Sequence, residues 1–185
     1  MKELSKEMRD VIDSLVEAIY ANQRLNINEP IDVKELAQNL GFSLAYIKPN
    51  IKDIKGIVLI NPEVSSLEGY STNKVIGINK TLSKSQNNSI IAHEIGHYFL
   101  HSEQGKKYFA HKWVDNEKEK NESEELEANY FGAALLLPKK PFIEKYHKFE
   151  KDNNLKNFVE TMSLSYNVSK ECVEKRIQEL ELKSI

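Results

Sequence analysis

The sequence contains one cysteine, Cys172, in 185 residues. A single thiol excludes a disulfide within the chain, and such sparing use of cysteine is typical of a reducing compartment. Cys172 also shares helical apolar spacing with Val168, Val173 and Ile177. That pattern favours a buried structural thiol over a nucleophile.

The sequence also lacks a strong net charge and a long apolar run. Its formal charge is -2, which provides no basic surface for nucleic acid. No segment approaches the roughly 18 consecutive apolar residues that a membrane span requires. The charged start M-K-E-L-S-K-E-M-R-D has no apolar signal-peptide core. We therefore expect a cytoplasmic protein that contacts no membrane and for which a nucleic-acid partner is unfavoured.

The composition, with 40% hydrophobic and 29% charged residues, is that of an ordinary globular protein. Apolar spacing predicts a helix over the first twenty residues, and Asp32 with Glu35 is the N-terminal signature of a short helix over 33–40. Residues 42–46, 56–60 and 75–79 are strand-like. These three strands predict a small sheet that either backs the next helix or offers an edge to an extended peptide.

The most informative stretch is residues 90–101, which read I-I-A-H-E-I-G-H-Y-F-L-H. On a helix His93 and His97 project from one face, so both imidazoles can reach a single zinc ion. Glu94 is offset beside them, where its carboxylate can act as a general base toward a water molecule. Most other side chains here are apolar, which predicts a buried helix whose polar groups need a metal site as partner. Ser83 with Gln86 predicts its cap.

His101 extends this series by one more turn. The helical rise places its Cα about 12 Å from that of His93, too far for both to bind one ion comfortably. We therefore expect His101 to support the site rather than to bind the metal. The alternative is a histidine that only interacts with the negative end of the helix dipole.

Two helical regions follow. Residues 122–137 predict a helix that Pro138 ends and that packs against the metal-binding helix. Residues 158–164 and 170–182, the second capped by Ser169, outline a helix-turn-helix. Because acidic and basic side chains balance in its second helix, protein contact or core completion is favoured over DNA binding there. The overall expectation is an α+β fold with a metallopeptidase domain over 1–150 and a helical subdomain over 151–185.

Together, A-H-E-I-G-H-Y-F-L-H and E-L-E-A-N-Y-F-G-A-A-L-L-L-P resemble the ImmA/IrrE family of zinc metallo-endopeptidases. The likeness covers residues 32–138. It implies a gluzincin-like fold in which His93, His97 and Glu127 bind Zn2+ and Glu94 is the general base. It also implies a protein substrate, typically a helix-turn-helix repressor of a mobile element or stress regulon. Gly132 departs from the alanine common in the family, which costs helix propensity.

Helix geometry supports the choice of Glu127. Glu125 points roughly 200° away from Glu127, so only one of the two can face the metal. Glu124 shares the face of Glu127 but lies in the first turn, where acids interact with the helix dipole. The alternative for Glu127 is a salt bridge with Lys139 or Lys140.

Three functions therefore compete. The first is a zinc endopeptidase that cleaves an intracellular regulatory protein. The second is a metal-stabilised module that binds a repressor or antitoxin without cutting it, and the third is a DNA-binding regulator. Glu94 favours the first, because a purely structural zinc site needs no general base. Candidate donors to the oxyanion are Tyr70, Tyr108, His111, Tyr146 and His147.

Overall fold

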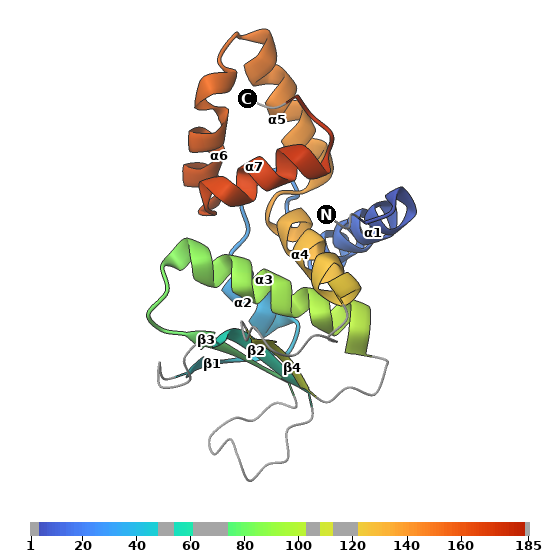
Figure 1. The fold of residues 1–185 in the computed structure, drawn as a ribbon, viewed down its shortest axis with the longest axis vertical. Coiled ribbons are helices and arrows are strands. Elements are labelled where there is room, and N and C mark those ends of the chain that lie inside the picture. The colour runs from blue at the N-terminus through green and yellow to red at the C-terminus, as the bar shows by residue number, and fades with distance from the viewer. Residues whose placement is uncertain (1–3, 48–53, 61–73, 103–107, 113–121, 184–185) are drawn as a thin grey trace.

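The computed structural model describes residues 4–47, 54–60, 74–102, 108–112 and 122–183. These residues form a mostly helical α+β fold, as the sequence predicts (Figure 1). The helices are α1 (Lys6–Asn22), α2 (Val33–Asn39), α3 (Lys84–His101), α4 (Glu122–Leu136), α5 (Lys139–Lys151), α6 (Phe158–Tyr166) and α7 (Lys170–Glu179), with a 3-10 turn at Leu155–Asn157. The strands are β1 (Ser43–Ile47), β2 (Ile54–Ile60), β3 (Lys74–Asn79) and β4 (Tyr108–Lys112).

The sheet has four strands in the order β1-β3-β2-β4. β1 runs parallel to β3, whereas β2 is antiparallel to both β3 and β4. The prediction of three strands was therefore one short, because residues 108–112 form a fourth strand. Its five residues carry no apolar alternation, and they become a strand by pairing with the edge of β2, which no local pattern reveals.

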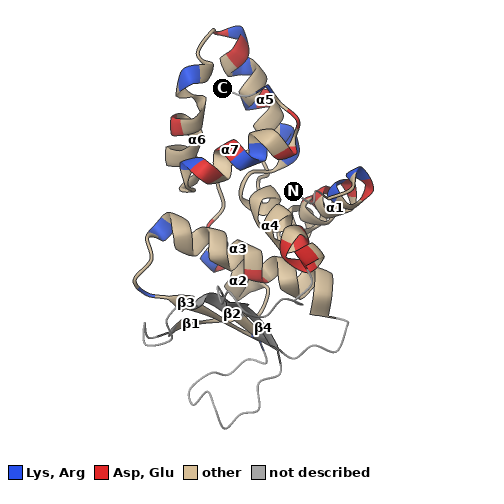
Figure 2. Cartoon of the chain, viewed as in Figure 1, with Lys and Arg blue, Asp and Glu red and all other residues tan. Residues whose placement is uncertain are grey.

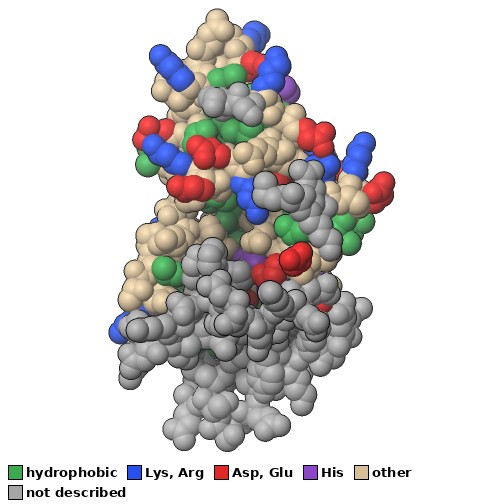
Figure 3. All heavy atoms as spheres, in the orientation of Figure 1, with side chains coloured by type: hydrophobic (Ala, Val, Ile, Leu, Met, Phe, Trp, Pro, Cys, Tyr) green, Lys and Arg blue, Asp and Glu red, His purple; other side chains and the backbone are tan. Residues whose placement is uncertain are grey.

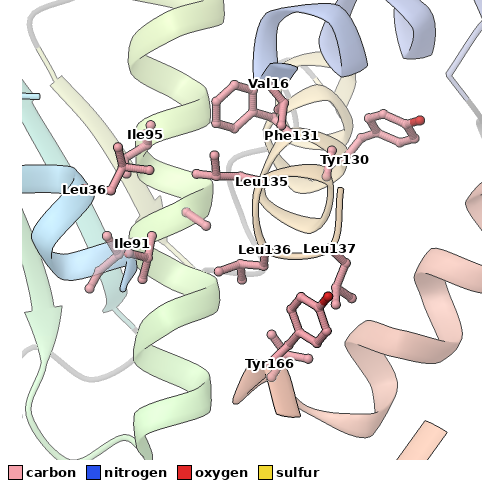
Figure 4. Close-up of a cluster of buried hydrophobic side chains, with 14 of the residues drawn as sticks. Val16, Leu36, Ile91, Ile95, Tyr130, Phe131, Leu135, Leu136, Leu137 and Tyr166 are labelled. Carbon is pink, nitrogen blue, oxygen red and sulfur yellow. The ribbon is translucent and has the colours of Figure 1, made fainter. Parts of the chain in front are cut away.

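Helix α3 lies against the sheet, with α2 beside it (Figure 1). Its N-terminus carries the predicted capping box: the Ser83 hydroxyl accepts from the Gln86 amide, and the Gln86 side chain accepts from the Ser83 amide. Ile91 and Ile95 are fully buried and point toward Leu36 of α2 (Figure 4). This apolar packing fixes the rotation of α3 about its axis, and therefore fixes which way its histidines point.

Helices α3 and α4 cross at very close range because glycine occupies the crossing point on both. A Cβ placed on Gly132 would lie 3.1 Å from the backbone nitrogen of His93. A Cβ on Gly96 would lie 2.9 Å from Cδ1 of Phe131 and 3.2 Å from the carbonyl oxygen of Ala128. The absence of these two side chains lets the backbone of α4 approach the metal-binding segment of α3.

The C-terminal helices pack back onto the start of the chain through Arg176 of α7. Its guanidinium is fully buried, donating to the Leu137 carbonyl at 3.1 Å and to Asp13 of α1 at 3.0 Å. Asp13 also accepts from the hydroxyl of Tyr130 at 3.0 Å. Burial raises the pKa of the nearby Cys172 thiol to about 11, so this cysteine is neutral, as a structural thiol would be.

Helix α7 begins at Ser169, whose hydroxyl accepts from the Cys172 amide as predicted. Acidic and basic residues lie close together along its ribbon (Figure 2). Within the described ranges, no helix is both long enough and apolar enough to cross a membrane.

Candidate metal centre

The site begins with two histidines on the buried face of α3. His93 and His97 are 6% and 3% exposed, and their Nε2 atoms lie 3.0 Å apart. Both rings therefore turn the same nitrogen toward one point. The one-turn spacing in the sequence predicts this pairing, and the packing of α3 on the sheet determines where the pair faces.

A third donor comes from α4. The carboxylate of Glu125 places one oxygen 3.5 Å from His93 Nε2 and the other 3.3 Å from His97 Nε2. One donor atom from each of these three residues lies within 4.8 Å of the others, so His93, His97 and Glu125 could hold a metal ion. The Glu125 side chain is 37% exposed, which leaves the site accessible from that side. Figure 3 shows histidine and acidic side chains together on this face.

The predicted third ligand, Glu127, lies elsewhere. Its Oε2 is 3.0 Å from Nε2 of His101, and its Oε1 accepts from the Ser123 hydroxyl at 3.1 Å. Lys139 and Lys140, the alternative partners, instead contact acidic residues of α1. As the helix argument requires, only one of Glu125 and Glu127 faces the histidine pair. The residue that faces the pair is Glu125 and not the predicted Glu127.

The sequence contains a signal for this rotation. Gly132 lies seven residues, or two turns, after Glu125, so the two share a face of α4. Because Gly132 packs on the backbone of His93, that face is the one directed at α3. From the sequence alone this glycine counts only as a loss of helix propensity, whereas in the structure it marks the contact surface.

Glu94 is fully buried beside the histidines. Within the part of the chain that the structure describes, neither of its carboxylate oxygens has a hydrogen-bond partner of normal geometry, although the backbone of Val58 on β2 comes close enough to lower its pKa slightly. Burial, and to a lesser extent the charge of Glu125, hold the pKa of Glu94 well above its ordinary value. A buried carboxylate without partners is costly, so the site is built around a group that still needs a ligand, such as a metal-held water.

His101 lies on the far side of His97 from Glu125. The Nδ1 atoms of His97 and His101 are 3.2 Å apart, and His101 is only 2% exposed.

Two of the oxyanion candidates, Tyr146 and His147, lie on α5. The Tyr146 hydroxyl donates to the Lys183 carbonyl, and His147 bonds Glu150. Tyr70 lies outside the described residues, as do the side chains of Tyr108 and His111.

Comparison with known proteins gives two similarities. Residues 37–178 match the model of a peptidase family, Peptidase M78, described as the IrrE N-terminal-like domain. Among solved structures, a Mycobacterium tuberculosis transcriptional regulator is similar with a TM-score of 0.57 and 19% identity, over 93% of this chain and 50% of that one. At that identity the likeness concerns the fold alone, and the chain spans half the length of that protein. No curated protein matches the chain.

Proposed function

Since the chain belongs to the family of IrrE N-terminal-like peptidase domains, we propose that it is a zinc-dependent endopeptidase that hydrolyses a peptide bond in an intracellular regulatory protein. The observation that carries this proposal is the triangle of donors beside the fully buried carboxylate of Glu94. It rests on His93, His97 and Glu125 as the metal ligands, with Glu125 in place of Glu127, and on Glu94 as the catalytic base.

The spacing of the donors supports zinc. Ligands held tetrahedrally at about 2.0–2.1 Å from zinc lie about 3.3 Å from one another. The two histidine nitrogens lie 3.0 Å apart, near that separation. The two oxygens of Glu125 lie 3.5 Å from His93 Nε2 and 3.3 Å from His97 Nε2, so the carboxylate faces the same point. Three protein ligands with an open fourth position are typical of catalytic rather than structural zinc sites.

Bound in this site, zinc would polarise the scissile carbonyl and acidify a water molecule. Glu94 would accept a proton from the attacking water at a carboxylate oxygen and then deliver it to the leaving amine. A zinc ion beside Glu94 would favour the ionised form that accepts this proton. The burial of His93 and His97 excludes bulk water from the other side of the site.

The substrate that we propose is a helix-turn-helix repressor, which the chain would bind and cleave in the cytoplasm. The resemblance to a transcriptional regulator in fold is consistent with a role linked to gene regulation. We assign the chemistry to residues 1–150 and propose that the helical region 151–185 contributes protein contacts. The alternative is a module that binds such a repressor without cutting it. Such a module needs no general base, so it would not explain why Glu94 is buried beside the donors.

A cleavage assay tests the proposal. Each helix-turn-helix protein that a neighbouring reading frame is found to encode is produced together with the chain, as wild type and as Glu94→Gln. We expect the wild type to cleave the repressor and the variant to bind equal zinc, measured by metal analysis, without cleaving. Equal cleavage by both proteins would refute the assigned base. Zinc binding and repressor binding without any cleavage by the wild type would favour the non-cleaving module.

A further inference from the structure

A line of hydrogen-bonding groups runs away from the metal site through the interior. His97 and His101 approach through their Nδ1 atoms at 3.2 Å, and His101 Nε2 lies 3.0 Å from Glu127 Oε2. The Ser123 hydroxyl donates to the other oxygen of Glu127 at 3.1 Å. His101 is 2% exposed and the Glu127 side chain 16%, so solvent has little access to this line.

A metal bound to Nε2 of His97 would fix the direction of every hydrogen bond in this line. His97 turns its Nε2 toward His93 and Glu125, so this nitrogen must be free of hydrogen to bind a metal. The proton of the neutral ring then lies on Nδ1 and is donated to Nδ1 of His101. His101 must therefore carry its own proton on Nε2, which it donates to the acceptor-only carboxylate of Glu127.

We propose that Glu127 and His101 are positioning residues that lock the ring of His97 for metal binding through Nε2. This inference rests on the proposed metal site. Glu127 selects the tautomer of His101, and His101 in turn supplies the acceptor that matches the correct tautomer of His97. Such outer partners orient the ligand and raise its basicity, and losing one typically costs 10- to 100-fold in metal affinity.

The arrangement distinguishes this role from that of a ligand. Glu127 is separated from His97 by the whole His101 ring, whereas Glu125 approaches both metal-facing nitrogens. A positioning role therefore requires both His101 and Glu127 for full affinity. A ligand role for Glu127 would require Glu127 but not His101.

The test is zinc affinity of the full chain, measured by competition with a chromophoric chelator, for which no substrate is needed. We expect Glu127→Ala and His101→Phe each to weaken zinc binding by about 10- to 100-fold. Glu127→Gln, which keeps an oxygen acceptor, should lose less than Glu127→Ala. The matched control is Glu122→Ala, which removes an exposed acid from the first turn of the same helix and should bind zinc like the wild type.

Two spectroscopic measurements separate positioning from ligation. In the cobalt-substituted protein, Glu127→Ala should keep the visible absorption band of the wild type because all three ligands remain, whereas Glu125→Ala should change it. In zinc-loaded protein with 15N-labelled histidine, NMR should find the His101 proton on Nε2. These readouts would not respond to a general loss of stability.

Several results would overturn the inference. Wild-type zinc affinity in both Glu127→Ala and His101→Phe would show that the line does not support the metal. A proton on Nδ1 of His101, or a cobalt band changed by Glu127→Ala and not by Glu125→Ala, would contradict the assigned roles. If Glu127→Ala does not fold, Glu127→Gln and the NMR measurement on the wild type still decide. A wild-type chain that binds no zinc would refute the proposed metal site itself, and the inference with it.

Discussion

Adding one methyl group at Gly96 tests whether the close crossing of α3 and α4 builds the metal site. In Gly96→Ala the new carbon would meet Phe131 Cδ1 at 2.9 Å, Phe131 Cβ at 3.1 Å and the Ala128 carbonyl oxygen at 3.2 Å. Carbon atoms normally settle at about 3.5–4.0 Å. Phe131 is fully buried and Ala128 contributes backbone, so neither has room to withdraw. Helix α4 must therefore shift away from α3 by about 0.6 Å, the difference between 3.5 and 2.9 Å.

Two energies oppose each other in this variant. Alanine is more favourable than glycine inside a helix by about 1 kcal/mol. Overpacking a well-packed interior costs about 1–3 kcal/mol. The expected balance is a net loss of about 1 kcal/mol, which lowers Tm by about 2–4 °C in a chain of this size.

The same shift also affects the metal. Because Glu125 is on α4 and the histidines are on α3, separating the helices stretches the distances from Glu125 to the two histidines, now 3.3 and 3.5 Å. A strain of about 1 kcal/mol on the site would weaken zinc binding by about fivefold. Urea unfolding of the zinc-free chain and chelator competition measure the two effects separately.

The double variant Gly96→Ala/Phe131→Leu provides the control. If the methyl group acts through Phe131, the two changes should be non-additive by about 0.5–3 kcal/mol. Additive effects would mean that the cost has another source. A Gly96→Ala variant that is as stable as the wild type and binds zinc equally would refute the reasoning that this crossing sets the geometry.

The remaining predictions concern Glu94, Arg176 and nucleic acid. Because burial raises the pKa of Glu94, the zinc-free protein should lose stability as pH rises from about 4.5 through that raised pKa. Glu94→Gln should lack this loss in urea unfolding, and parallel pH profiles would contradict the explanation. Arg176→Ala should cost about 3 kcal/mol by leaving the Asp13 carboxylate with fewer partners, and a change below about 1 kcal/mol in urea unfolding would show the buried pair to be dispensable. Binding to duplex DNA should be weak and non-specific at physiological salt, because α7 mixes both charges; a sequence-specific nanomolar complex in a gel-shift assay would refute this.

The sequence predicts well what depends on local geometry. The spacing of His93 and His97, the capping box at Ser83 and the caps at Asp32 and Ser169 involve residues within one turn of each other, so they follow from helix rules alone. The α+β class follows from a run of strand-like segments that is followed by a run of helical ones.

Features that depend on two distant segments could not be predicted in this way. Whether Glu125 or Glu127 faces the histidines depends on how α4 is rotated against α3, and both candidates satisfy the same local rules. Strand β4 exists through its pairing with β2. The buried pair of Arg176 and Asp13 joins residues 163 positions apart, so the local sequence around either residue does not predict its partner.

That pair also has a consequence for how the protein is made. Asp13 emerges from the ribosome 163 residues before its guanidinium partner. Until α7 has emerged, Asp13 lacks its arginine, and its buried carboxylate relies on Tyr130 and Lys139. The contact between α1 and the C-terminal helices is therefore completed only after α7 has been made. A chain cut after residue 150 would keep both metal-binding helices and lose the arginine that pairs with Asp13.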